Sequence, residues 1–428
     1  MRPDKLNLKN FRELFFKPLF LSILLLFTII FCVFVLSAPT YETIDDSFMR
    51  TLVEGSYTKS HQGSYFLMFT SSIIGRFLSF LYITFPGFYW YDIYELSLLS
   101  IATLIIGICV FSKSDLVFNT FCFLALFFIL TPCFVKFQFS VVSGTLSIAI
   151  LVYAIDVLQN GIKNKSHLFV SILIVLSLSF FAVLVRHNIF ILMFMVGFLY
   201  FCLFISRNNY KRFIFLSIGG GFVSLLVIAI FYACVLNDSL DPDIQYAMKS
   251  NDYLVMLYND TIATSNLKRP WEPIENSVFN LNKLLSKHGW YRGDYRLLLA
   301  WADLGNYDIF SNEKKSMIVN EIGDLISVKN NSQFRFSVQD YMQVLKRYFW
   351  IPIVLLFAFF NKKTLIYFVS FTLIFVFSIC LLNLVFRSIP HRVWINMANL
   401  GVVVFLYYLK VNSKFIMDSI SRIIIEIK

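Results

Sequence analysis

The sequence has few charged residues for its length. Of its 428 residues only 15% are Asp, Glu, Lys or Arg, whereas 58% are hydrophobic and 50 are Phe. This composition excludes an ordinary soluble domain. The apolar runs are continuous over about 17 to 24 residues and do not alternate with period two, which favours transmembrane helices. We therefore predict an all-α polytopic membrane protein surrounded by a lipid bilayer.

Several common site motifs are also missing. The sequence contains no GxGxxG, P-loop, HExxH or GxSxG segment, which removes the usual signals of soluble nucleotide-sugar and hydrolase chemistry. Its seven cysteines form no CxxC pair and lie within or at the ends of apolar runs, so we expect small core side chains. No cofactor is expected, although the participation of a divalent metal is left open.

The basic residues indicate the orientation of the chain in the membrane. The formal net charge is +11, but Lys and Arg cluster at the ends of apolar segments, which is the positive-inside pattern and does not indicate nucleic-acid binding. This pattern predicts that both termini are cytoplasmic. The candidate spans lie at about 19–37, 64–85, 93–111, 115–131, 138–157, 167–185, 188–205, 213–236, 348–360, 364–385 and 393–410.

If all eleven segments crossed the membrane, the number of crossings would differ by one from the number that the charge pattern requires. Two polar regions, 38–62 and 237–346, are expected on the outer face, which requires an even number of spans between them. The run 115–131 is short and is followed by Pro132, so we predict that this run does not cross and that ten helices span the membrane. Eleven spans is the alternative.

The same pattern predicts three regions. Residues 1–236 form a transmembrane bundle that includes the acidic outer loop 38–62. Residues 237–346 form a small, mainly helical external region, and residues 347–428 contain the last membrane helices and a cytoplasmic tail.

Asp45 and Asp46 are the candidate catalytic residues. They directly follow the first apolar run, and adjacent residues of a helix point in different directions. One carboxylate could therefore act as a base while the other stabilises the start of the following helix. The alternative is that both only cap that helix.

Three arginines are expected on the same side of the membrane. Charge at the membrane edge is costly and suggests function, and a guanidinium group binds phosphate through two donors. Arg387 and Arg392 flank a proline, and Arg186 separates two apolar runs. The alternative is that their side chains extend from the helix ends to the membrane surface.

A segment rich in Trp, Tyr and Asp in the external region is typical of a carbohydrate-binding surface. Its aromatic rings could stack on sugars and its carboxylates could bind hydroxyl groups, although a small hydrophobic core is the alternative. The candidates for acceptor or sugar binding are Trp290, Tyr291, Asp294 and Trp301, together with His61 in the first outer loop.

Taken together, the order of these features resembles the C-type-fold glycosyltransferases that use lipid-linked sugars. The segments YETIDDSFMRTLVEGSYT, FPGFYWYD, KFQFS, GWYRGDYRLLLAWADLGNYDIFS and RSIPHRVW are similar, in this order, to features of bacterial O-antigen and surface-polysaccharide glucosyltransferases. The adjacent Asp45-Asp46 pair departs from the spaced D-x-D or E-x-D of this class, which leaves the identity of the base open.

This resemblance implies an inverting transferase in the bacterial inner membrane. A sugar, with glucose expected, would move from a polyprenyl phosphate donor to a glycan acceptor such as the O-antigen of lipopolysaccharide. Asp45 or Asp46 would be the base, and Arg387, Arg392 and Arg186 would stabilise the phosphate leaving group. The alternatives are an O-antigen or capsule polymerase, which would depend on arginines and no outer carboxylate, and a transporter or flippase for lipid-linked sugars.

Overall fold

The computed structural model describes residues 18–37, 39–41, 44–55, 65, 67, 70–112, 115–161, 165–202 and 391–411, and also 229, 232 and 317. These residues are mostly helical, and five of the helices are long and apolar enough to cross a membrane. This supports a helical membrane protein. The chain divides into two compact units, which comprise residues 1–43, 92–229 and 335–428 in the first and residues 44–91 and 230–334 in the second.

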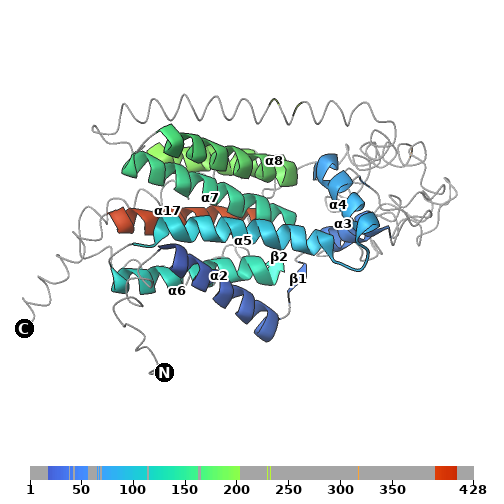
Figure 1. Ribbon diagram of the computed structural model, residues 1–428, viewed down its shortest axis with the longest axis horizontal. Coiled ribbons are helices and arrows are strands. Elements are labelled where there is room, and N and C mark those ends of the chain that lie inside the picture. The colour runs from blue at the N-terminus through green and yellow to red at the C-terminus, as the bar shows by residue number, and fades with distance from the viewer. Residues whose placement is uncertain are drawn as a thin grey trace, which may run out of the picture. The chain divides into compact units, whose positions relative to one another are not determined.

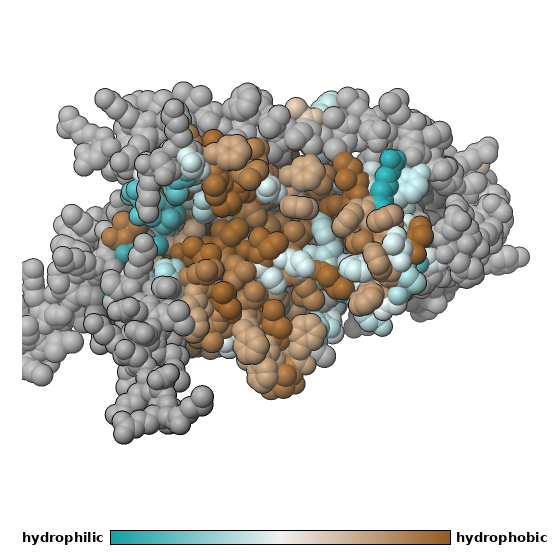
Figure 2. All heavy atoms as spheres, viewed as in Figure 1, coloured by the Kyte–Doolittle hydropathy of each residue, from teal (hydrophilic) through white to brown (hydrophobic). Residues whose placement is uncertain are grey.

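The first unit is a bundle of long helices, which lie side by side in Figure 1. Large apolar side chains cover much of the face seen in Figure 2. The described elements of the first unit are α2 (Pro18–Cys32) with a π-helical turn (η1, Val33–Ser37), β1 (Thr40–Tyr41), α5 (Trp90–Val110, in this unit from Asp92), α6 (Leu116–Val135), β2 (Lys136–Phe137), α7 (Phe139–Asn160), α8 (Lys165–Cys202) and α17 (His391–Val411).

Contacts between helices fix their directions within this unit. Strands β1 and β2 pair in parallel, with Thr40 opposite Lys136, so α2 and α6 finish at the same end, which we call the β end. Helix α5 is antiparallel to α2, because Gly107 near the end of α5 approaches Ser22 near the start of α2. The hydroxyl of Tyr41, in β1, donates a hydrogen bond to Asp92, which places the start of α5 at the β end.

Helix α8 is two helices joined by a reversal at Arg186. The backbone there is extended, with φ −163° and ψ 95°. Before the break, Ser171 meets Tyr153 and Ala182 meets Ser143, so this half is antiparallel to α7. After it, Gly197 lies against Leu151, so the second half is parallel to α7. The predicted separation of 167–185 from 188–205 is therefore confirmed.

Helix α7 lies at the centre of the unit, where α8 and α17 both pack on it. Helix α17 is parallel to α7, because Asn396 contacts Ser140 at the β end and Tyr407 contacts Asp156 at the other end. Asn399 of α17 donates to the carbonyl oxygen of Ile129 in α6 over 3.5 Å. Because α6 ends at the β end, where α17 begins, these two helices are antiparallel. From α2 to the second half of α8, the described long helices of this unit thus alternate in direction.

The run 115–131 was expected to be too short to cross because Pro132 follows it, but the helix does not end at this proline. Helix α6 continues to Val135 and has 20 residues, which is long enough to cross. Pro132 lies inside this helix, where a proline removes one helical hydrogen bond and can bend a helix without ending it. The short element is instead α4 (Ser72–Thr84), whose 13 residues cover about 20 Å of a hydrocarbon core of about 30 Å. The antiparallel α2 and α5 require an even number of crossings between them. The total of ten spans stays a prediction.

The second unit is described through α3 (Ile44–Glu54), α4 and the start of α5. Helices α3 and α4 pack together, and Met49, Leu52 and Val53 of α3 are fully buried. The carbonyl oxygen of Tyr65 lies so close to Gly75 that a larger residue there would collide with it. The predicted boundaries of the external region, at 237 and 346, lie outside the described residues.

Candidate functional site

Asp46 is a buried carboxylate in the first turn of α3. Its side chain is 0% exposed, and its Oδ1 accepts a hydrogen bond of 3.1 Å from the hydroxyl of Tyr91. A negative charge at this position is favoured by the N-terminal end of the helix. Asp45 lies beside it in the same turn, but its side chain is outside the described residues. Of the two predicted carboxylates, Asp46 is therefore the one whose side chain the structure describes, and it is buried.

Two further contacts surround this pair, one to the backbone of Tyr91 and one to a second residue of α3. The hydroxyl of Tyr82, in α4, accepts a hydrogen bond of 3.2 Å from the backbone N–H of Tyr91. The guanidinium carbon of Arg50, one turn after Asp46 in α3, lies 4.2 Å from the centre of the Tyr89 ring. The second unit therefore contains a group of one carboxylate, one arginine and three tyrosines, which come from α3, α4 and the residues at the start of α5. The arginine keeps its positive charge at physiological pH.

Arg186 lies at the β end of the first unit, where two residues of α7 fix it. Ser143 Oγ is 2.9 Å from the carbonyl oxygen of Ala182 and 3.1 Å from that of Arg186, so this hydroxyl group stabilises the break in α8. The guanidinium carbon of Arg186 lies 4.6 Å from the centre of the Phe139 ring. Phe139 and Ser143 are one turn apart on α7, so a single face of that helix positions both ends of Arg186.

The start of α17 lies against a second face of the same turns of α7. Asn396 Nδ2 donates a hydrogen bond of 3.0 Å to the carbonyl oxygen of Ser140, and the Asn396 side chain occupies the space that a Cβ on Gly144 would need. Arg392 lies one turn before Asn396 in α17, although its side chain is not described. Arg186 and the helical turn that carries Arg392 thus come to the same end of α7.

This arrangement has a chemical consequence at the β end. The N-terminus of α7 carries a partial positive charge, and Arg186 adds a full one. Together they favour an anion such as a phosphate group. Among the predicted arginines, Arg387 lies outside the described residues, as do His61, Trp290, Tyr291, Asp294 and Trp301. Their assigned roles stay predictions.

Analysis of the sequence missed several polar residues that the structure places at helix ends. Glu95 is 1% exposed in the second turn of α5, and its presence in an apolar run is a signal that could have identified it. Tyr91 could not be found this way, because its contact with Asp46 joins residues 45 positions apart.

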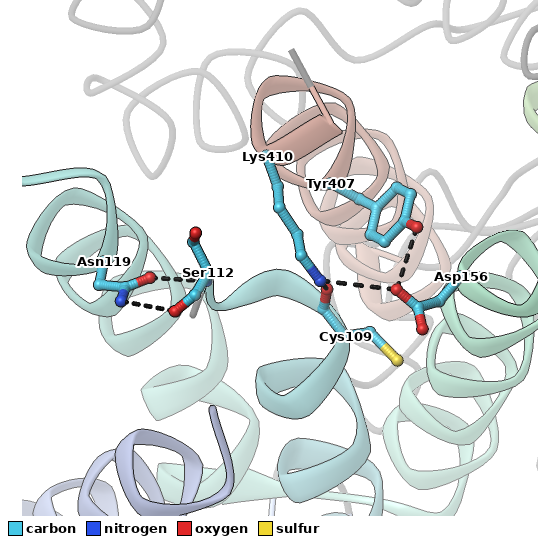
Figure 3. A network of polar contacts seen from close by, with 6 residues as sticks. All are labelled: Cys109, Ser112, Asn119, Asp156, Tyr407 and Lys410. Carbon is cyan, nitrogen blue, oxygen red and sulfur yellow. Dashed lines mark hydrogen bonds and ion pairs between the residues drawn. The ribbon is translucent and has the colours of Figure 1, made fainter. Parts of the chain in front are cut away.

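A second missed group lies at the end of the first unit opposite the β end (Figure 3). Lys410 Nζ donates to the carbonyl oxygen of Cys109 over 2.5 Å and lies 3.5 Å from Asp156 Oδ1. The same carboxylate oxygen accepts a hydrogen bond of 3.0 Å from the hydroxyl of Tyr407. This group joins the C-terminal turns of α5, α7 and α17, and Lys410 complements the carbonyl ends of the helices.

A nearby contact extends the same end of the bundle. The side-chain amide of Asn119 in α6 forms two hydrogen bonds with the backbone of Ser112: its Oδ1 accepts from the N–H over 2.7 Å and its Nδ2 donates to the carbonyl oxygen over 2.9 Å. Figure 3 shows this pair beside the Lys410 group. The chain after α5 is thereby fixed to the first turn of α6.

Among the described residues, no three His, Cys, Asp or Glu side chains come together in a way that could hold a metal ion. Comparisons of the chain with models of protein families, with characterised proteins and with solved structures find no match.

Proposed function

We propose that the chain is an integral-membrane glycosyltransferase. It would move a hexose, with glucose expected, from a polyprenyl phosphate donor to a surface polysaccharide such as O-antigen on the outer face of the bacterial inner membrane. The observation that carries this proposal is the full burial of Asp46 in the first turn of α3, the helix that comes next in the chain after the first apolar helix. A buried carboxylate is costly to keep unless it has a function or a strong partner.

Asp46 would act as the general base. The ionised carboxylate is the form that accepts a proton, and its burial makes that form costly. The hydrogen bond from the Tyr91 hydroxyl and the position at the start of α3 both offset this cost. In the proposed reaction an acceptor hydroxyl oxygen bonds to the anomeric carbon of the sugar as the bond from that carbon to the phosphate oxygen breaks. The hydroxyl proton passes to the carboxylate, and polyprenyl phosphate leaves with inversion at the anomeric carbon.

Arg186 would stabilise the phosphate group of the donor as negative charge develops on it. The aromatic ring of Phe139 and the hydroxyl of Ser143 support this role, because they hold the side chain and backbone of Arg186 beside the N-terminus of α7. Arg392 and Arg387 are the further candidates for this role, and Trp290, Tyr291, Asp294, Trp301 and His61 are the candidates for binding the acceptor.

The test is transfer of labelled sugar from polyprenyl phosphate donor to surface glycan in membranes that contain equal amounts of each variant. Asp46→Asn should lower the rate by about 10² to 10⁴-fold, the usual contribution of a general base. Asp45→Asn and Glu95→Gln are the matched controls, because they remove a neighbouring and a separate carboxylate. Full loss in Asp45→Asn alone would move the base to Asp45.

One result would favour a different function. If the wild-type protein shows no donor-dependent transfer but glycan chain length depends on its presence, then the polymerase alternative replaces the transferase. Insensitivity of that chain length to Asp46→Asn would further reduce Asp46 to a residue that stabilises the start of α3.

A further inference from the structure

Helix α4 has two faces of opposite character. One face packs toward α3 and contains the buried side chains of Ile74, Leu78 and Tyr82. The other exposes large apolar side chains at helical spacing, with Phe77 55%, Phe80 60% and Ile83 70% exposed. Ile73 continues this stripe at 38% exposure. A stripe of this length on a soluble surface would favour association, so something other than water is expected to cover it.

Aromatic residues continue the exposed surface directly after α4. Phe85, Phe88 and Tyr89 are all more than half exposed. Trp90 lies against the rings of Phe85 and Phe88 and donates its indole N–H to the carbonyl oxygen of Phe85 over 2.9 Å. Clusters of Trp and Tyr are enriched where a membrane protein passes through the headgroup region.

We propose that α4 lies in the plane of the bilayer surface, with Ile73, Phe77, Phe80 and Ile83 inserted at the boundary between headgroups and acyl chains. The occupant of this face is therefore lipid. Three observations select it. Helix α4 is too short to span, and only residues 85–89 separate it from the candidate span that begins at Trp90. The antiparallel α2 and α5 also require an even number of crossings between them, so a single crossing by α4 would not fit.

A charged residue on the outward side of α4 fits the same position. Arg76 is exposed, and its guanidinium carbon lies 5.1 Å from the centre of the Tyr65 ring. An arginine beside an apolar stripe is placed to bind anionic lipid headgroups, which attract basic residues at the membrane surface. An apolar stripe with a flanking cation is the pattern of an interfacial helix.

The seating of α4 has a consequence for Asp46, which rests on the proposed function. Asp46 is connected to α4 through Tyr91, whose hydroxyl it binds and whose N–H binds Tyr82 of α4. A helix fixed at the headgroup level would therefore set the depth of the carboxylate. That depth suits a donor whose sugar and phosphate lie at the surface while its polyprenyl chain stays in the bilayer.

The inference is tested by photo-cross-linking of the full chain in liposomes of phosphatidylethanolamine and phosphatidylglycerol with radiolabelled acyl chains. p-Benzoylphenylalanine is incorporated in place of Phe77 or Phe80. We expect both proteins to acquire labelled lipid on illumination, as should a positive control at Phe31, which is 54% exposed on α2. Incorporation at the exposed Glu54 of α3 is the negative control.

Two outcomes would overturn the proposal. Lipid labelling at Phe77 and Phe80 that is as low as at Glu54, while Phe31 is labelled, would place this face in water. A covalent dimer in place of a labelled monomer would assign the face to a second copy of the chain.

A second variant connects the seating to transfer. Phe77→Glu with Phe80→Glu should lower the transfer rate about tenfold or more, because a small displacement of a catalytic group has a large effect, whereas Phe77→Leu with Phe80→Leu should retain it. Lipid labelling with no transfer by the wild type would contradict the proposed function and leave the membrane seating intact. Transfer without lipid labelling would contradict the seating alone.

Discussion

Two of the aspartate–tyrosine pairs that the structure describes have nearly the same hydrogen-bond length and different surroundings. In the second unit Tyr91 donates to Asp46 over 3.1 Å, and in the first unit Tyr407 donates to Asp156 over 3.0 Å. Asp46 is 0% exposed and lies at the start of a helix, whereas Asp156 is 24% exposed, lies near the end of a helix and pairs with Lys410.

The difference separates a structural pair from a candidate catalytic one. Lys410 compensates the charge of Asp156 and also caps α5 at Cys109, so every member of that group joins helices. Asp46 lies at the N-terminal end of its own helix and accepts a hydrogen bond from Tyr91, and both of these features favour a negative charge. A hydrogen bond from tyrosine is therefore a poor guide to function unless burial and helix direction are considered with it.

The largest expected effect distinguishes the two carboxylates. Asp46→Asn should lower sugar transfer by about 10² to 10⁴-fold while the protein keeps its thermal stability within a few degrees, because the amide retains the size of the side chain but cannot accept the proton. Asp156→Asn should retain transfer within about threefold. The measurement is transfer rate and thermal unfolding of the two purified variants side by side. Equal losses of transfer would remove the distinction.

The next effect compares the cations at the two ends of the first unit. Arg186→Gln should raise the KM for the polyprenyl phosphate donor or lower kcat by about 10 to 100-fold, as expected for the loss of a charge-assisted contact with phosphate. Lys410→Met should change neither constant by more than about twofold. Steady-state kinetics with varied donor concentration provide the check. Donor binding that is insensitive to Arg186→Gln but sensitive to Lys410→Met would contradict this, because the anion site would then lie beside Lys410, at the end of the first unit opposite the β end.

A smaller effect is expected from the two tyrosines. Tyr91→Phe removes a hydrogen bond to Asp46 worth about 0.5 to 1.5 kcal/mol, so transfer should fall by about 2 to 10-fold. Tyr407→Phe removes the equivalent bond to Asp156 and should leave transfer unchanged. The rates are best measured with protein levels matched by immunoblot. A loss in Tyr407→Phe alone would reverse the roles of the two pairs.

The smallest expected effect is the stability of the structural pair. Because Lys410 and Asp156 are about one-quarter exposed, their coupling free energy should be only about 0.2 to 1 kcal/mol. A double-mutant cycle of Lys410→Met and Asp156→Asn, followed by thermal unfolding in detergent, measures this coupling. A coupling of zero would show that Lys410 acts only through its contact with the carbonyl oxygen of Cys109.

The comparison also explains what the sequence could predict. Long apolar runs indicated helix α7 and the break at Arg186, because length and charge are local properties. Pro132 misled the assignment of α6, since a proline inside a helix can bend it without ending it. The run 64–85 appeared long enough to span, but the helix begins only after Ser71, whose hydroxyl caps it, and ends before Pro86 and Gly87.

In the candidate site, too, local properties could be predicted from the sequence and tertiary contacts could not. Asp46 and Arg186 could be selected because charge beside an apolar run is visible in the sequence. Their partners Tyr91 and Phe139 could not, because tertiary contacts choose one aromatic residue among many in a chain with 50 Phe and 22 Tyr. The direction of the helices also required a contact between distant strands, the pairing of Thr40 with Lys136.

The most direct measurement of the central claim follows both products of the proposed reaction. Purified protein in liposomes is given polyprenyl phosphate donor with a labelled sugar, together with the acceptor glycan. The account predicts that label moves to the glycan, that polyprenyl phosphate appears in equal amount, and that Asp46→Asn abolishes both. Label that stays on the lipid with wild-type protein, under conditions in which the protein still alters glycan length, would contradict it.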